Sequence, residues 1–135
     1  MATAQPAAAQ PQSRKVRLTL EQERARHSWE KAGEARAKLG KGYKDYVNDA
    51  KGLPALIMNS GLMQVMAFCH DKGGRHETLA QHLREWLHKQ CGTPSGFEEF
   101  MQHLMNCEPS RFQLITTEAF AWLRWLRQMA SARVG

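Results

Sequence analysis

The chain has 135 residues, of which 42% are hydrophobic and 24% are charged. This length is typical of one domain, and the composition excludes a disordered or fibrous protein. Nineteen Lys and Arg residues against thirteen Asp and Glu residues leave a formal net charge of +6, which favours a partner with dense negative charge. We expect a flexible N-terminal tail over residues 1–16 and a single helical domain over residues 17–133.

The cysteines and the apolar stretches indicate in which cellular compartment the protein is expected. Cys69, Cys91 and Cys107 are widely spaced and form no CxxC pair, so neither a disulfide framework nor a structural zinc site is predicted. Residues 1–13 lack the apolar core of a signal peptide, and polar residues interrupt the apolar stretch over residues 53–69. We therefore expect a soluble, cytoplasmic protein with no membrane partner.

The first predicted element is a helix. Apolar residues recur three and four apart along the chain, and no segment alternates polar and apolar residues as a half-buried strand does. This helix is expected to begin at Thr19, with Gln22 completing a capping box, and to end near Leu39. Gly40 and Gly42 then mark a break or a bend.

The middle of the chain predicts two helices. A short helix over residues 43–50 is expected to stop at Gly52, and Pro54 suits the first turn of the next helix. Residues 53–72 carry apolar side chains nearly all round, which predicts a central core helix that is buried on most faces.

Three further helices are predicted after the glycine pair at 73–74. They are expected over about residues 75–90, over about residues 95–106, and from Thr116 or Thr117 to about residue 132, with Glu118 in the positive first turn of the last one. The predicted fold class is all-α, a compact single-domain bundle of five to seven helices around the central apolar helix.

Most of the net charge lies in residues 14–51, which carry a balance of +5 against +1 in residues 52–135. Cations recur every seven residues along the first helix and form one slowly drifting row. The row consists of Arg17, Arg24, Lys31 and Lys38, and Lys44 extends it. Such a row either keeps a surface helix solvated or binds a phosphate backbone.

The last predicted helix offers a second group of cations, Arg124 and Arg127, beside two tryptophans. Trp122 shares the apolar face and is expected in the core. Trp125 points away from that face, so it either packs on the first helix or anchors a protein interface.

Enzyme motifs are absent from the sequence. There is no Gly-rich phosphate loop, no GxSxG and no HExxH. His103 and Cys107 are four residues apart, but nothing has the paired spacing of a zinc site. We expect no enzymatic activity, no metal site and no cofactor.

Two groups of short strings carry a family resemblance. Residues 46–73 contain LPALI at 53–57, Asn59, GL at 61–62, Gln64 and AF at 67–68, and TEA at 117–119 is followed by WLRWLR at 122–127. With these strings the chain resembles, over residues 19–132, the small subunit of the type III-B CRISPR effector, the Cmr complex. Met63, where glycine is expected, and Gln128, where a basic residue is common, depart from the pattern.

The resemblance implies an all-helical, non-catalytic subunit that is present in several copies and stacks along the duplex of guide RNA and target RNA in antiviral RNA interference. The implied partners are these RNAs, the other Cmr subunits and further copies of the chain. Phosphate contacts without sequence preference are expected first from Arg17, Arg24, Lys31, Lys38 and Lys44, and then from Arg124 and Arg127.

A rival prediction is a free-standing helical DNA-binding regulator. It requires a recognition helix with polar side chains directed at base edges, and only residues 75–90 are a candidate. A small hydrolase is a formal third class that no group of residues supports.

Overall fold

The computed structural model describes residues 16–134, so the expected tail lies almost entirely outside the described residues. The elements are α2 (Leu20–Leu39), the 3-10 turn η2 (Gly40–Gly42), α3 (Tyr43–Ser60), α4 (Leu62–Lys72), α5 (Gly74–Cys91), α6 (Phe97–Asn106) and α7 (Pro109–Ala132). Residues 16–134 contain no strand, which confirms the predicted all-α class. Among these helices, none has a segment sufficiently long and apolar to traverse a lipid bilayer.

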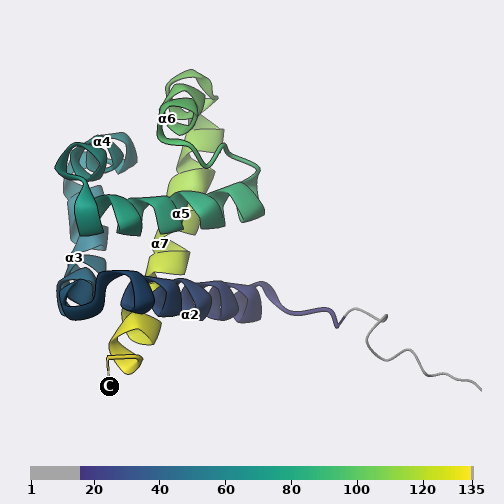
Figure 1. The fold of residues 1–135 in the computed structure, drawn as a ribbon. Helices are drawn as coiled ribbons and strands as arrows, with labels where there is room; N and C mark the ends of the chain where they lie inside the picture. The colour runs from purple at the N-terminus through teal and green to yellow at the C-terminus, as the bar shows by residue number, and fades with distance from the viewer. Residues whose placement is uncertain (1–15, 135) are drawn as a thin grey trace, which may run out of the picture.

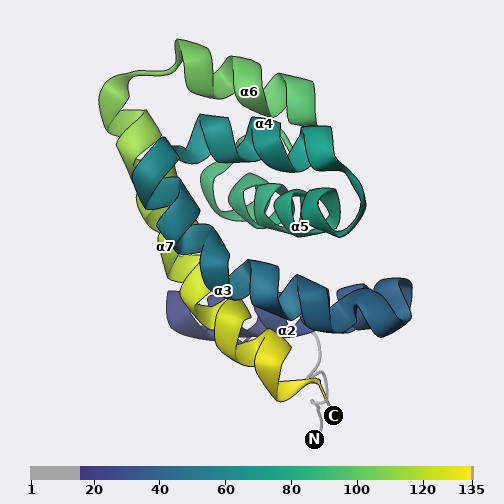
Figure 2. The same ribbon diagram turned by 90° about the vertical axis from the view of Figure 1, so that its left-hand side faces the viewer.

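The long C-terminal helix α7 holds the bundle together. It crosses α2 and α5 on one side and packs against α3 on another (Figure 1). At the end of the molecule that lies away from α2, helix α4 packs beside α5 and α6 (Figure 2). The core is continuous through these helices and includes Trp86 of α5 and Trp122 of α7.

The capping box at the start of α2 confirms the prediction. Thr19 Oγ1 accepts a hydrogen bond from the Gln22 backbone N–H at 3.1 Å, and the Gln22 side chain accepts one from the Thr19 N–H at 2.8 Å. The helix ends at Leu39, and Gly40 follows as its C-cap, as expected.

The predicted stop at Gly52 is wrong, because α3 continues through Gly52 and Pro54 to Ser60. A proline inside a helix costs one backbone hydrogen bond. Leu53 and Ile57 are buried on the core side of the same segment, and this packing keeps the helix continuous.

The predicted central helix over residues 53–72 is also wrong, because Gly61 divides it between α3 and α4. Gly61 has φ 86° and ψ 158°, a conformation that is almost restricted to glycine. The chain therefore changes direction there. Leu56, Met58 and Phe68 remain exposed, so the segment is not buried on most faces.

The later helices agree with the prediction except for the start of α7. That helix begins at Pro109, which suits a first turn because proline has no N–H to leave unpaired. The predicted start at Thr116 or Thr117 is therefore wrong. Glu118 lies inside the helix rather than in its first turn, and its side chain faces α2 and α5.

Candidate nucleic-acid interface

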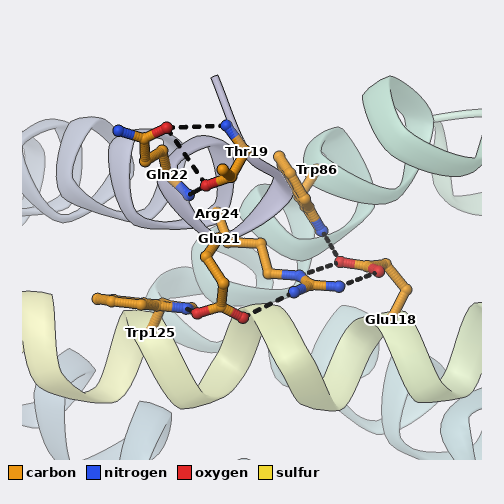
Figure 3. A network of polar contacts seen from close by, with 7 residues as sticks. All are labelled: Thr19, Glu21, Gln22, Arg24, Trp86, Glu118 and Trp125. Atoms are coloured by element: carbon orange, nitrogen blue, oxygen red, sulfur yellow. Dashed lines mark hydrogen bonds and ion pairs between the residues drawn. The ribbon is translucent and has the colours of Figure 1, made fainter. Parts of the chain in front are cut away.

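The predicted row of cations on α2 does not lie uniformly in solvent. Arg24 donates two hydrogen bonds of 2.8 Å to the Glu118 carboxylate and one of 2.9 Å to Glu21 (Figure 3). The Arg24 and Glu118 side chains are only 14% and 11% exposed. The hydrogen bonds to Glu118 raise the pKa of Arg24 above its ordinary value, although burial opposes the shift.

Two tryptophans complete this network. Trp86 Nε1 donates to Glu118 Oε2 at 3.0 Å, and Trp125 Nε1 donates to Glu21 Oε1 at 2.8 Å (Figure 3). Trp125 thus packs on α2, which is the first of the two alternatives drawn from the sequence. Trp122 is fully buried, as predicted. The network joins α2, α5 and α7 within the chain.

Lys31, the next cation of the row, is also paired. Its ammonium lies 2.7 Å from Glu85 Oε1 and 3.2 Å from Glu34 Oε1. Burial lowers the pKa of Lys31, but hydrogen bonds to the two carboxylates raise it above its ordinary value. Possible metal-ligand atoms lie within 4.8 Å of one another on Glu34, His82 and Glu85. The two carboxylates of this group are the ones that the Lys31 ammonium already pairs with.

The two ends of the row are exposed. Arg17 lies on the surface before α2, and Lys38 is exposed while its ammonium donates to Thr78 Oγ1 at 3.0 Å. The row therefore presents Arg17 and Lys38 to solvent and holds Arg24 and Lys31 in ion pairs. The carboxylates that bind the middle cations include Glu118 from α7 and Glu85 from α5, which no pattern within α2 reveals.

A separate group of cations lies where α2 turns into α3. Arg36, Lys41 and Lys44 line a hollow of about 440 Å³, together with Gly40, Tyr43 and Val134. None of the lining residues is acidic. We call Arg36, Lys41 and Lys44 the basic corner.

The basic corner is fixed to the C-terminal end of α7. The Tyr43 hydroxyl donates to the Ala130 carbonyl at 2.6 Å, and Arg36 Nη1 donates to the Arg133 carbonyl at 2.9 Å. Arg36 was not selected from the sequence because it falls outside the seven-residue row. The turn at Gly40–Gly42 was the available signal, since a bend brings cations on both sides of it together.

Arg124 and Arg127 lie apart from the basic corner, in a groove between α3 and α7. Both are exposed, and neither makes an ion pair within residues 16–134.

The alternative prediction, a DNA-binding regulator, requires α5 to enter a groove of DNA as a recognition helix. The packing of α5 does not leave its arginines free for this role. Arg84 of α5 is 1% exposed and bonds the Ser95 carbonyl and the Glu77 carboxylate. Arg75 is held by Asp49 at 2.8 Å. Since α5 packs against α2, α3, α4, α6 and α7, it is a core helix and not a recognition helix.

The fold and its charge distribution define a small all-helical protein with groups of exposed cations on its surface. The profile of the family described as "CRISPR-associated protein (Cas_Cmr5)" matches residues 20–133. The structure is similar to the crystal structure of a CRISPR-associated Cmr5 family protein from Thermus thermophilus, with 26% identity and a TM-score of 0.71 over 87% of this chain and 100% of that one. No curated protein sequence matches the chain.

The chain therefore belongs to the Cmr5 family, the small subunits of the type III-B Cmr complex. The predicted family resemblance is confirmed, and members of this family are structural subunits that work with other Cmr proteins.

Proposed function

We propose that this chain is a non-catalytic small subunit whose copies stack along the duplex of guide RNA and target RNA and contact phosphates without sequence preference. The observation that carries the proposal is the basic corner, where three cations surround one hollow with no carboxylate in its lining. Base pairing between the two RNAs supplies the sequence specificity.

The chemistry of such a contact is electrostatic. Each Lys or Arg that neutralises a phosphate releases condensed counterions, so binding weakens steeply with salt and does not depend on the base sequence. Arg17 and Lys38 add exposed cations on the α2 side. Arg24 and Lys31 contribute only if they give up their carboxylate partners, so we assign them no phosphate contact.

Several weak sites on one strand act together. A single small domain with a few phosphate contacts binds weakly, but copies lined up on one duplex share a high effective concentration. The surrounding Cmr subunits are expected to hold these copies in place.

The test is the salt dependence of target RNA binding by the assembled complex with its guide RNA. The double variant Lys41→Ala/Lys44→Ala is expected to weaken binding for all target sequences. It is also expected to flatten the log–log salt slope by about 0.7 to 0.9 for each phosphate that is no longer neutralised. Lys31→Ala is expected to leave the slope unchanged, because that ammonium is already paired.

Lys89→Ala is the matched control, since Lys89 is an exposed cation of α5 outside the basic corner. A salt slope that is the same for the Lys41/Lys44 variant and for this control contradicts the proposal.

A further inference from the structure

Helix α2 carries an exposed tryptophan that the core does not use. Trp29 is 44% exposed, whereas Trp86 and Trp122 are fully buried. Trp29 also lies outside the cluster of side chains that forms the core. A large aromatic ring at the surface offers apolar area and a π face to another molecule.

The guanidinium of Arg133 lies on the Trp29 ring. Arg133 Cζ is 4.3 Å from the ring centroid, and Arg133 Nη1 donates to the Trp29 carbonyl at 3.0 Å. A Cβ added at Gly33 would come within 2.6 Å of the same Nη1, so the glycine leaves the space that the guanidinium occupies. The Arg133 carbonyl accepts a hydrogen bond from Arg36 at 2.9 Å. The chain thus holds the ring from one side by a cation–π contact.

The ring belongs to a row of side chains that leads to the basic corner. Arg26, Trp29, Gly33 and Arg36 are spaced to share one face of α2. Helix α7 crosses α2 and ends just beyond it, which brings Arg133 to this face (Figure 1). Seven residues of helix span about 10 Å, so Trp29 lies about that far along α2 from Arg36 of the basic corner.

The surroundings of the ring are cationic. Arg26, Arg36 and Arg133 make no ion pair within residues 16–134, and neither do the lysines of the basic corner. Glu30 follows Trp29 directly, but one residue is about 100° of helical rotation, so the carboxylate leaves α2 on a different face. Such a surface attracts a polyanion.

A nucleotide is the ligand that combines these properties. Every base has a flat π face that stacks on an aromatic side chain, and the phosphates of the same strand bind cations. The bases of a duplex are already stacked on one another, so only an unpaired nucleotide offers a free face to a protein.

We propose that Trp29 stacks on an unpaired nucleobase of an RNA strand whose neighbouring phosphates lie on the basic corner. The base occupies the ring face that Arg133 leaves open. The inference rests on the proposed function, because the stacked base belongs to the RNA that the basic corner contacts. It adds a preference for single-stranded RNA over a fully paired duplex.

The first measurement is the affinity of the full chain for a fluorescently labelled, single-stranded uridine RNA at low ionic strength, by fluorescence anisotropy. Trp29→Leu is expected to weaken binding by about 5- to 150-fold, the loss typical of one stacked base. Trp29→Tyr keeps an aromatic ring and is expected to retain most of the affinity. Phe68→Leu is the matched control, since Phe68 is 45% exposed and belongs to α4, and it is expected to bind like the unmodified chain.

A blunt, fully paired RNA duplex is the second probe. Trp29→Leu is expected to bind this duplex as tightly as the unmodified chain does, because no base face is free in it. Single-stranded RNA is expected to quench the tryptophan emission of the unmodified chain. Most of this quenching is expected to be absent from Trp29→Tyr, because the stacked ring is the one that is replaced.

Thermal melting confirms that each variant folds, and Trp29→Met takes the place of Trp29→Leu if the leucine variant does not. Equal affinities of Trp29→Leu and Phe68→Leu for single-stranded RNA overturn the inference. An equal loss of affinity for the duplex, or no binding of single-stranded RNA by the full chain, overturns it as well.

The salt slope separates this inference from the proposed function. A stacked base releases no counterions, so Trp29→Leu is expected to lower the affinity at every salt concentration without changing the log–log slope. An unchanged affinity in Trp29→Leu, with a flattened slope in Lys41→Ala/Lys44→Ala, removes the stacked base and leaves the phosphate contact standing. A loss in Trp29→Leu with an unchanged slope in the lysine variant keeps the stacked base and removes the basic corner from the proposed function.

Discussion

The two cations in the middle of α2 and the cations on the α3 side of the molecule are the same residue types in opposite environments. Arg24 and Lys31 are largely buried, and each is bound by two carboxylates. Lys44 and Arg127 lie on the surface with no ion pair in residues 16–134. A regular spacing of cations therefore does not identify a polyanion surface, because the neighbouring helices determine which cations are already neutralised.

The physical reason for the difference is desolvation. Moving a charge out of water costs several kcal/mol, so a buried guanidinium persists only with good hydrogen bonds to an opposite charge. Glu118 supplies these bonds to Arg24. Exposed cations keep their hydration and remain available to a phosphate or a carboxylate of another molecule.

The largest expected effect comes from breaking the buried pair. Glu118→Gln leaves Arg24 buried beside a neutral amide and is expected to lower the free energy of unfolding by about 3 kcal/mol. Urea denaturation of the isolated chain measures the change. Glu98→Gln, at an exposed and unpaired position, is the control and is expected to change stability by less than about 0.5 kcal/mol.

The double variant Arg24→Met/Glu118→Leu sharpens this test. It removes both charges and is expected to be more stable than Glu118→Gln, because no uncompensated charge remains. A Glu118→Gln variant that matches the control in stability contradicts the structural role of the pair.

The second prediction concerns the pH dependence of stability, which two buried histidines are expected to produce. Burial is the largest cause that lowers the pKa of His27 and of His82 to about 4, and Lys31 contributes to both shifts. His27 lies between Trp86 and Trp122, with ring centroids 5.1 and 5.4 Å away.

Both histidines are thus neutral in the folded chain at pH values where the unfolded chain binds protons. Above the unfolded pKa of about 6.5 the histidines do not lower the free energy of unfolding. As the pH falls from there toward 4, each histidine lowers the free energy of unfolding by up to about 1.4 kcal/mol per pH unit. Urea midpoints measured from pH 7.5 down to about pH 5 are expected to fall. His82→Gln is expected to reduce the slope, and an equal slope in this variant contradicts the assignment.

Two glycine substitutions test the backbone of α3, which carries one wall of the groove. Gly61→Ala forces a Cβ into the φ 86° conformation and is expected to cost about 1 to 3 kcal/mol. Gly52→Ala is the matched variant, since Gly52 lies inside α3 with nothing within 4 Å of an added Cβ.

Gly52→Ala is expected to raise stability by about 0.5 to 1 kcal/mol, because alanine is the better helix former. Circular dichroism during thermal melting compares the two variants. Destabilisation by Gly52→Ala would show that α3 is interrupted at Gly52, as the sequence first indicated.

The sequence predicted the features that depend on neighbours along the chain. Thr19 and Gln22 cap the same turn, and Gly40 ends α2, so local spacing was sufficient. Trp122 was placed in the core by helical periodicity alone. Gly52 and Pro54 misled the prediction, because packing of the α3 core face overrides the stop expected at Gly52 and the new helix start expected at Pro54.

The site was less predictable than the fold. Lys44 was selected from the sequence, but Arg36 was not, since only the turn between α2 and α3 brings the two into one hollow. Arg24 and Lys31 were selected for their spacing. Their partners Glu118 and Glu85 are far away in sequence, and helix packing alone brings them into contact.

By itself, the amino-acid sequence determined an all-helical domain, its first capping box and its membership of a family, because propensity, caps and motifs are local properties. Only the tertiary structure decided which cations are free. Ion pairing depends on distances of a few ångströms between side chains from different helices, and these distances are set by how α2, α5 and α7 pack together.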